Sequence, residues 1–366
     1  MPLSNDGIAD DARIRAAVPT LKHLAERGAK VIVMSHLGRP KGVEPALSLR
    51  PVATALAKQL GRDVQFAEDC VGQAARGAVG RLQPGNVLLL ENVRFHPEEE
   101  ANDPEFAGRL AALGEIYVND AFAASHRAHA SVVGVAEHLP AYAGELMEAE
   151  LAALHQALDD PKRPLVAVVG GAKVSTKVGV LRHLLEKVDA LLIGGAMANT
   201  FFKAQGYPTG SGLVEDSALD DARKVEAKGG RKLVLPVDLV CAEKMEAGQP
   251  IQVVAADAVE PGWMALDIGP KSVAEFKKHI STASTIVWNG PMGVAEIADF
   301  AQGTRAVGEA MAASKAYTLV GGGDTAAAID SLGLAGRFSH VSTGGGATLE
   351  YLEGKELPGV AILKDA

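Results

Sequence analysis

The chain has little of what would direct a protein toward nucleic acid, membranes or export. Aromatic residues make up 4% of the sequence, too few for the stacking platforms that hold single-stranded nucleic acid. No window approaches eighteen uninterrupted apolar residues, and the first residues have neither a basic flank nor an apolar stretch, so neither a membrane partner nor export is expected. With 36 basic and 45 acidic residues, the net charge of -9 gives no global affinity for polyanions.

Cysteine is also scarce, with Cys70 and Cys241 far apart and without CxxC spacing. The two residues indicate neither a disulfide framework nor a zinc site, and a cytoplasmic location is expected. The chain lacks the Gly-x-x-x-x-Gly-Lys-Ser/Thr pattern of a P-loop. Its 366 residues, 48% of them hydrophobic, are enough to bury two cores.

Apolar runs alternate with amphipathic stretches, which predicts parallel sheets and an α/β architecture. Residues 145–158 place apolar side chains on one helical face, and the polar, proline-containing stretch 159–164 ends that pattern, so an interdomain helix is predicted there. The apolar runs predicted as strands are Val31 to Met34, Val87 to Leu90, Ile116 to Val118, Leu165 to Val169, Ala190 to Ile193, Leu233 to Leu235, Ile286 to Trp288 and Thr318 to Val320.

A loop with the character of an anion site, Ser-His-Leu-Gly-Arg-Pro-Lys-Gly at 35–42, follows the first of these runs. Its glycines allow close backbone approach, and its basic side chains suit phosphate or carboxylate oxygens. An ordinary β-to-α connection with solvated basic residues is the alternative. Further cations at the edges of expected elements in this half are Arg13, Arg94 and Arg127, each of which alone is most often a surface residue.

Glycine clusters in the second half at 170–171, 194–195, 321–323 and 344–346, each after an apolar or β-branched run. Tight turns would explain any one cluster, but amides at a helix N-terminus also form a phosphate cradle. Residues 321–326 satisfy G-x-G-x-x-A as well. A dinucleotide site also requires an acidic residue at the end of the next strand. Here that strand ends in Val341-Ser342-Thr343, which contains no acidic residue.

Charged residues accompany these glycines. Lys173 and Lys177 are four apart at an expected helix start, so both ammonium groups are expected on one face, where an anion would relieve their unfavourable position. Asp324 is placed either to hold Mg²⁺ or to cap a helix. Glu296 is suited to ribose hydroxyl groups, with a solvated surface position as the alternative.

Seven motifs together resemble those of the phosphoglycerate kinase family, in order from Asp10 to the C-terminus. They are Ser-His-Leu-Gly-Arg-Pro-Lys-Gly at 35–42, Glu-Asn-Val-Arg-Phe at 91–95, Asn-Asp-Ala-Phe at 119–122, His-Arg-Ala-His-Ala-Ser at 126–131, Gly-Gly-Ala-Lys-Val-Ser-Thr-Lys at 170–177, Trp-Asn-Gly-Pro-Met-Gly at 288–293 and Gly-Gly-Gly-Asp-Thr at 321–325.

The resemblance implies two doubly wound parallel-sheet, Rossmann-like domains that face a cleft and are joined by a helix. Residues 1–144 would form the N-terminal domain, which binds 3-phosphoglycerate, and the segment 355–366 would pack back on it. Residues 145–354, including the interdomain helix 145–158, would bind the Mg-nucleotide. The implied protein is a cytoplasmic monomer of glycolysis or carbon fixation, without a nucleic-acid or membrane partner.

The implied reaction is reversible, Mg²⁺-dependent phosphoryl transfer from 1,3-bisphosphoglycerate to ADP, without a covalent enzyme intermediate. By motif match, the acid substrate would be held by Arg13, His36, Leu37, Gly38, Arg39, Arg94 and Arg127. The nucleotide site would contain Gly171, Ala172, Lys173, Lys177, Gly194, Gly195, Asn289, Pro291, Glu296, Gly321, Gly322, Gly323, Asp324 and Thr325, with Asp324 on Mg²⁺. The phosphoryl group in transfer would be surrounded by Arg13, Lys173, Gly345 and Gly346.

The chain departs from the family pattern at its start, where a strand bearing Asp-Leu-Asn-Val-Pro is expected and only Met1-Pro2-Leu3 matches the strand's end. A sequence that starts too late is the favoured explanation. The alternative is a catalytically impaired nucleotide-binding homologue. A dinucleotide-dependent oxidoreductase built on residues 321–326 is a second alternative, of another class.

Overall fold

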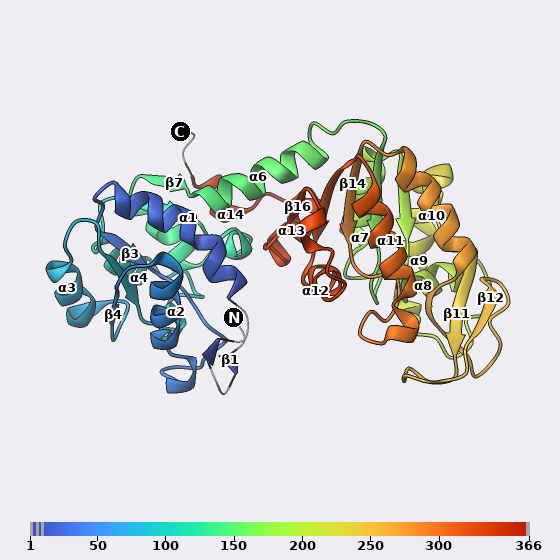
Figure 1. Cartoon of the computed structure of the whole chain (residues 1–366), viewed down its shortest axis with the longest axis horizontal. Coiled ribbons are helices and arrows are strands. Elements are labelled where there is room, and N and C mark those ends of the chain that lie inside the picture. The colour runs from blue at the N-terminus through green and yellow to red at the C-terminus, as the bar shows by residue number, and fades with distance from the viewer. Residues whose placement is uncertain (1–2, 5–6, 9–10, 364–366) are drawn as a thin grey trace. The chain divides into compact units, whose positions relative to one another are not determined.

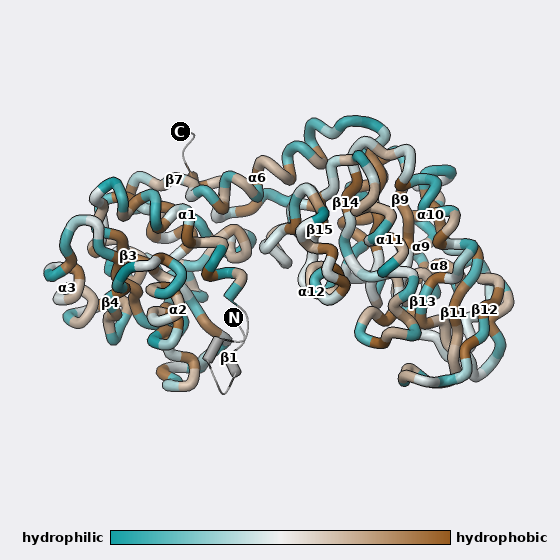
Figure 2. Tube along the Cα trace, viewed as in Figure 1, coloured by the Kyte–Doolittle hydropathy of each residue, from teal (hydrophilic) through white to brown (hydrophobic). Residues whose placement is uncertain are grey.

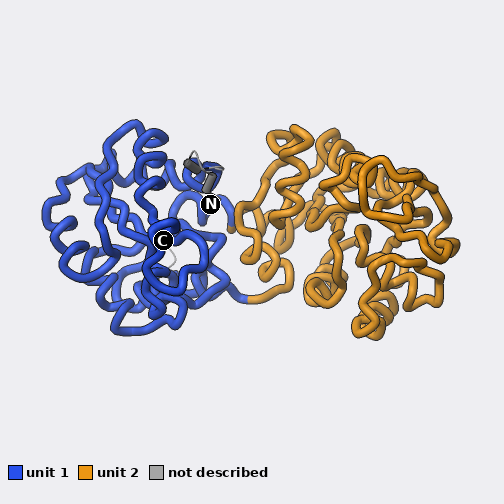
Figure 3. The backbone as a smooth tube through the Cα atoms, turned by 90° about the horizontal axis from the view of Figure 1, so that it is seen from below, with its two compact units in different colours: residues 1–150, 356–366 blue, residues 151–355 orange. Residues whose placement is uncertain are grey.

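The computed structural model describes residues 3–4, 7–8 and 11–363. It consists of two compact units, residues 1–150 with 356–366 (unit 1) and residues 151–355 (unit 2; Figure 3). Met1 and Pro2, which match the end of the family's first strand, lie outside the described residues. The next residues form β1 (Leu3–Ser4), paired antiparallel with β2 (Gly7–Ile8).

Unit 1 contains a parallel sheet in the order β3-β5-β4, made of β3 (Val31–Val33), β4 (Val64–Ala67) and β5 (Val87–Leu90). A second parallel pair joins β6 (Tyr117–Asn119) to β7 (Ala141–Ala143). The helices of this unit, labelled in part in Figure 1, are α1 (Ala12–Glu26), α2 (Arg50–Leu60), α3 (Gly72–Arg81), α4 (Pro104–Ala111), α5 (Val135–His138) and α14 (Pro358–Ala361).

The central strand β5 is buried along its whole length, as expected of a parallel strand that is covered on both faces. Its side chains alternate between two apolar clusters. Leu88 and Leu90 belong to one, and Val87 and Leu89 to the other. The strand therefore fixes the middle of unit 1, and its carboxyl end places residues 91–96 at one edge of the sheet.

Unit 2 contains a six-stranded parallel sheet in the order β10-β9-β8-β14-β15-β16. This is the doubly wound order 3-2-1-4-5-6, whose switch point, the usual ligand position, lies between β8 and β14. The strands are β8 (Leu165–Val169), β9 (Ala190–Ile193), β10 (Leu233–Val234), β14 (Thr285–Asn289), β15 (Tyr317–Gly321) and β16 (His340–Val341). The helices are α7 (Val178–Lys187), α8 (Met197–Ala204), α9 (Leu219–Gly229), α10 (Pro270–Thr282), α11 (Gln302–Ala313), α12 (Gly323–Ser331) and α13 (Gly346–Leu352).

The helix predicted at 145–158 is present as α6 (Glu145–Leu158), and the two units divide within it, after Glu150. Its first turn is capped from unit 1. Asp120 Oδ1 accepts the backbone N–H groups of Leu146 at 2.9 Å and Met147 at 3.2 Å. Thr20 Oγ1 accepts that of Glu145 at 2.9 Å. These bonds satisfy amides that have no partner inside the helix.

Every predicted strand is present, but the expectation of parallel sheets missed a second sheet in unit 2. It is antiparallel in the order β12-β11-β13, from β11 (Asp238–Ala242), β12 (Gln252–Ala255) and β13 (Met264–Ile268). Polar residues such as Asp238 and Asp267 interrupt the apolar pattern in these strands, whereas β9 is a continuous hydrophobic segment in Figure 2. Among the described residues, no helix has both the length and the apolarity needed to cross a bilayer.

Leu88→Ala should destabilise unit 1 by about 2–5 kcal/mol, because it removes buried methyl groups from a strand packed on both faces. Ile116→Ala is the matched control in the same unit, since Ile116 is 62% exposed, and should cost about 0.5 kcal/mol or less. Denaturant unfolding measures both changes. Equal effects would contradict this account of the core.

Candidate functional site

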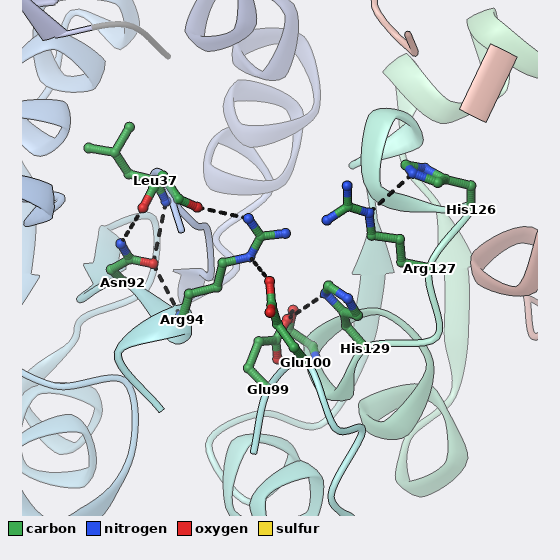
Figure 4. A network of polar contacts seen from close by, with 10 residues as sticks. Leu37, Asn92, Arg94, Glu99, Glu100, His126, Arg127 and His129 are labelled. Carbon is green, nitrogen blue, oxygen red and sulfur yellow. Dashed lines mark hydrogen bonds and ion pairs between the residues drawn. The ribbon is translucent and has the colours of Figure 1, made fainter. Parts of the chain in front are cut away.

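In unit 1, the loops that leave β3 and β5 are joined by the side chain of Asn92, which is fully buried. Its Oδ1 accepts the backbone N–H of Leu37 at 3.3 Å and that of Arg94 at 3.1 Å. Its Nδ2 donates to the carbonyl groups of Leu37 at 2.8 Å and Leu47 at 3.0 Å. Figure 4 shows this amide between Leu37 and Arg94. The predicted anion loop is therefore held in register with the motif at 91–95.

Arg94 is a buried cation within this arrangement, with 7% of its surface exposed. Its Nη1 donates to the Gly38 carbonyl at 2.8 Å, and its Nε lies 3.2 Å from Glu100 Oε1 in an ion pair that is not aligned for a hydrogen bond. Burial lowers the pKa of Arg94, and the nearby Glu100 carboxylate partly offsets this by favouring the charged form. The guanidinium nevertheless stays protonated, as it does in proteins generally. The side chain therefore offers positive charge and spare N–H groups.

The two histidines beside Arg94 are held neutral. Burial lowers the pKa of His36 to about 3, and the charges of Arg94 and Arg127 add to the effect. Burial and Arg94 also lower the pKa of His129, whose Nδ1 lies 3.7 Å from Glu99 Oε1 (Figure 4). A neutral imidazole still has one N–H to donate, and a bound anion would favour its charged form.

The other predicted cations of unit 1 are more exposed. Arg127 Nε donates to His126 Nε2 at 3.1 Å (Figure 4), whereas Arg39 has no recorded side-chain partner among the described residues. Arg13 lies in the first turn of α1, and Arg15, not Arg13, pairs with Asp11. Electrostatic coupling therefore groups His36, Arg39, Arg94 and Arg127, while no interaction in the described part of the chain connects Arg13 with them.

In unit 2, the loops after β8, β9 and β14 meet backbone to backbone at the switch point. The N–H of Gly171 donates to Pro291 O at 3.1 Å, and that of Gly195 donates to Met292 O at 2.8 Å. Gly195 has φ of +69°, and a Cβ built on it would lie 2.5 Å from Gly171 N. Only glycine fits this contact.

Because those amides are used inside the protein, the expectation that glycines 170–171 and 194–195 present free N–H groups to a phosphate is wrong. The N–H of Gly170 donates to Asn289 O at 3.0 Å, and that of Gly194 to Val169 O at 2.9 Å. These glycines serve close packing between strand-end loops. Amides without an intrahelical partner lie instead in the first turns of α12 and α13, which begin at Gly323 and Gly346.

The expectation that Lys173 and Lys177 share a helical face is also wrong, because α7 begins only at Val178. Residues 175–177 form a turn instead, and the Glu215 carboxylate accepts the Ser175 N–H at 3.0 Å and the Ser175 hydroxyl at 2.6 Å. Lys177 Nζ donates to the carbonyl groups of Gly170 at 2.6 Å and Asn289 at 3.2 Å, and burial lowers its pKa to about 8. Lys173 is exposed.

At the end of β15, Gly322 is the N-cap of α12, so Asp324 is not the cap. Asp324 is instead an exposed carboxylate at the second helical position, and no hydrogen bond to it is recorded within the described residues. Thr325 Oγ1 accepts the N–H of Gly290 at 2.6 Å, and Asn289 Nδ2 donates to Gly321 O at 3.0 Å. These bonds join the end of β14 to β15 and α12, and neither of them uses the Asp324 carboxylate.

Glu296 is exposed in the loop between β14 and α11. A residue that the sequence analysis missed holds the start of α11, where this loop ends, and packs against the loop at Gly293. Asp267, 4% exposed at the end of β13, accepts the N–H of Gly303 at 2.7 Å and that of Ile268 at 2.8 Å. A Cβ on Gly293 would lie 2.4 Å from its Oδ1. Burial raises the pKa of Asp267 from 3.8 to about 7. No motif marks this residue, since Gly293, which packs against its carboxylate, and Gly303, which bonds to it, lie 26 and 36 positions further along the chain.

Comparison with known proteins points to one family. The family model described as phosphoglycerate kinase matches residues 1–355. The phosphoglycerate kinase of Moorella thermoacetica is 55% identical over 100% of this chain and 94% of its own length. The solved structure of phosphoglycerate kinase from Coxiella burnetii is 46% identical, with a TM-score of 0.91 over 99% of this chain and 93% of that one. The solved structure of phosphoglycerate kinase from Pyrococcus horikoshii is 33% identical, with a TM-score of 0.87 over 99% of this chain and 93% of that one.

Asp267→Asn should change how the stability of unit 2 depends on pH. Because the folded-state pKa is raised, this carboxyl stabilises the fold fully below about pH 4, and the contribution is lost as pH rises through about 7. The stability of the unsubstituted protein relative to Asp267→Asn should therefore fall by about 2–4 kcal/mol across that window. Thermal unfolding at a series of pH values measures the difference. The control Asp257→Asn, at an exposed aspartate of unit 2, should show no such slope.

Proposed function

The chain belongs to the phosphoglycerate kinase family, and we propose that it binds the acid substrate on unit 1 and the Mg-nucleotide on unit 2. The activity is that of the family, the reversible phosphoryl transfer from 1,3-bisphosphoglycerate to ADP, which gives ATP and 3-phosphoglycerate. A role in glycolysis or carbon fixation, a cytoplasmic location and a monomeric state are proposed from the family alone.

The observation that carries the assignment of unit 1 is the buried guanidinium of Arg94 beside two neutral histidines. An anion is the ligand that compensates a buried cation, and planar guanidinium groups match carboxylate and phosphate oxygens. Exposed Arg39 and half-buried Arg127 would add donors from neighbouring loops. The proposed acid-substrate residues are Arg13, His36, Leu37, Gly38, Arg39, Arg94 and Arg127.

For unit 2, the proposed nucleotide site is the switch point between β8 and β14 together with the start of α12. The free amides of α12 suit phosphate oxygens, and Glu296 suits ribose hydroxyl groups. The proposed residues are Gly171, Ala172, Lys173, Lys177, Gly194, Gly195, Asn289, Pro291, Glu296, Gly321, Gly322, Gly323, Asp324 and Thr325.

Asp324 fits a magnesium ion, because its carboxylate is exposed and accepts no hydrogen bond from the described residues. One such residue is enough, since Mg²⁺ on nucleotides usually takes only one or two protein carboxylates. When bound, Mg²⁺ would supply positive charge to the nucleotide phosphates. Two of the three N–H groups of Lys177 donate to carbonyl groups at strand ends, so this side chain would fix the positions of the two loops. Its third N–H group would remain as a donor to the nucleotide.

The chemistry proposed for the chain's own residues is alignment and charge stabilisation, since phosphoryl transfer needs little acid-base help. Arg13, Lys173 and the amides of Gly345 and Gly346 would surround the phosphoryl group in transfer. Because direct transfer requires the attacking oxygen of one ligand to reach the phosphorus of the other, and the two ligands are proposed on separate units, we also propose that the units close on each other. Closure would exclude water, which otherwise accepts the phosphoryl group.

The oxidoreductase alternative does not agree with the topology of unit 2. In a doubly wound sheet the dinucleotide fingerprint follows the first strand, which is β8 here, whereas residues 321–326 follow β15, in the fifth position. Nothing in the comparisons favours a catalytically impaired homologue.

A coupled assay with ATP, Mg²⁺ and 3-phosphoglycerate tests the proposal directly. Turnover should require both substrates and should stop when a chelator removes the metal ion. Nucleotide binding without turnover of 3-phosphoglycerate would support the impaired alternative instead.

Arg39→Ala should raise the KM for 3-phosphoglycerate roughly ten- to a hundredfold, because a charged hydrogen-bond donor to the acid substrate is lost. This change corresponds to a loss of about 1.5–3 kcal/mol of binding free energy. The KM for ATP should not change. Arg76→Ala removes another exposed arginine of unit 1, on α3, and should change neither value. A selective ATP defect in Arg39→Ala would mean that the two units are assigned the wrong way round.

Lys173→Ala should lower kcat much more than nucleotide affinity, since the exposed ammonium group is proposed to act mainly as charge develops on the phosphoryl group. Lys224→Ala, at an exposed lysine on α9, serves as the control for lost charge. Steady-state kinetics combined with nucleotide binding by calorimetry separates the two effects. Equal losses in both quantities would contradict the role given to Lys173.

A further inference from the structure

A group of metal-binding side chains outside both proposed sites lies at the carboxyl ends of β4 and β5. Asp69 and Cys70 follow β4, and His96 follows β5, its neighbour in the sheet. One donor atom from each of the three residues lies within 4.8 Å of the other two. Cys70 is fully buried, whereas Asp69 and His96 are partly exposed, so the group has an apolar side and a solvent side.

The positions of these donors are fixed by their neighbours. Asp69 Oδ1 accepts the backbone N–H of Cys70 at 2.7 Å and contacts His96 Nε2 at 2.7 Å. The His96 ring packs against Phe106, with 5.2 Å between ring centroids. Phe106 and Cys70 both belong to the apolar cluster on one face of the sheet. The three side chains are therefore held by the core of unit 1 and not by a flexible surface loop.

We propose that Asp69, Cys70 and His96 form a binding site for a transition-metal ion, with Zn²⁺ the expected ion. A thiolate, an imidazole and a carboxylate are the donor types that zinc takes, and three protein ligands with one open position for water is an established zinc arrangement. The thiolate and imidazole discriminate against Mg²⁺, which prefers oxygen ligands. This site is separate from the one proposed at Asp324, which lies in unit 2.

Metal binding would displace the thiol proton of Cys70 and break the contact between His96 and Asp69. Without metal, Cys70 is a thiol that carries its proton, since an ordinary thiol is largely protonated near neutral pH. Formation of the metal–sulfur bond releases that proton to solvent, and the contact between His96 Nε2 and Asp69 opens as both become ligands. His96 lies two residues after Arg94, so a bound ion would also fasten the loop after β5 that carries this arginine.

The test uses the whole 366-residue chain, freed of metal by a chelator and titrated with Co²⁺ as a spectroscopic substitute for Zn²⁺. We expect a thiolate-to-cobalt charge-transfer band that saturates at one equivalent, that Zn²⁺ abolishes and that excess Mg²⁺ leaves unchanged. Absence of the band, or its loss with Mg²⁺, would overturn the proposal. The readout is independent of catalysis, so it does not depend on the proposed function.

Variants identify the ligands. Cys70→Ser should abolish the band, and Asp69→Asn and His96→Asn should each weaken Co²⁺ binding by about tenfold or more. Cys241→Ser changes the chain's other buried cysteine, and His279→Asn changes a histidine paired with Glu275; both should keep the band. Thermal unfolding without metal establishes that each variant folds, and if Cys70→Ser does not, His96→Asn decides. A band that persists in Cys70→Ser, unchanged affinity in His96→Asn, or loss of the band in Cys241→Ser would sink the proposal.

Discussion

Hydrogen bonds between loops that leave neighbouring parallel strands are the constraint on which both candidate sites depend. In unit 1 the Asn92 amide bonds to Leu37 and Arg94, and so holds the loops after β3 and β5 together. In unit 2, Lys177 bonds to the chain at the ends of β8 and β14. Since parallel strands deliver all their carboxyl ends to one edge, these short bonds decide which side chains remain for a ligand.

Each site contains a cation whose burial is only partly compensated. Arg94 in unit 1 and Lys177 in unit 2 have lowered pKa values because burial disfavours their charged forms. A bound anion would recover part of that electrostatic loss. Sites of this kind are organised before the ligand arrives, which is the condition under which fixed charges stabilise a developing phosphoryl charge.

Carboxylates at strand ends have different roles because their neighbours differ. Asp267 is enclosed by backbone N–H groups and holds the start of α11, whereas Asp324 is exposed at the start of α12, where we propose that it binds a metal ion. Asp69 is a third case, placed beside a thiol and an imidazole. The residue type is the same in each, so the chemistry follows from burial and from the donors within reach.

The sequence by itself determined the family, the α/β class, α6 and eight strands of the parallel sheets, because motifs and apolar runs are local patterns. The short strands β4, β7 and β16 were not among the predicted runs. Only the tertiary structure showed that the amides of Gly171 and Gly195 bond within the protein and that Lys173 and Lys177 precede α7. It also showed that Asp267 holds the start of α11, next to the loop that carries Glu296. The spacing of the cysteines indicated no zinc site, yet folding brings together Asp69, Cys70 and His96 from the segments that follow β4 and β5. Contacts between distant segments depend on sheet order and register, which no local pattern records.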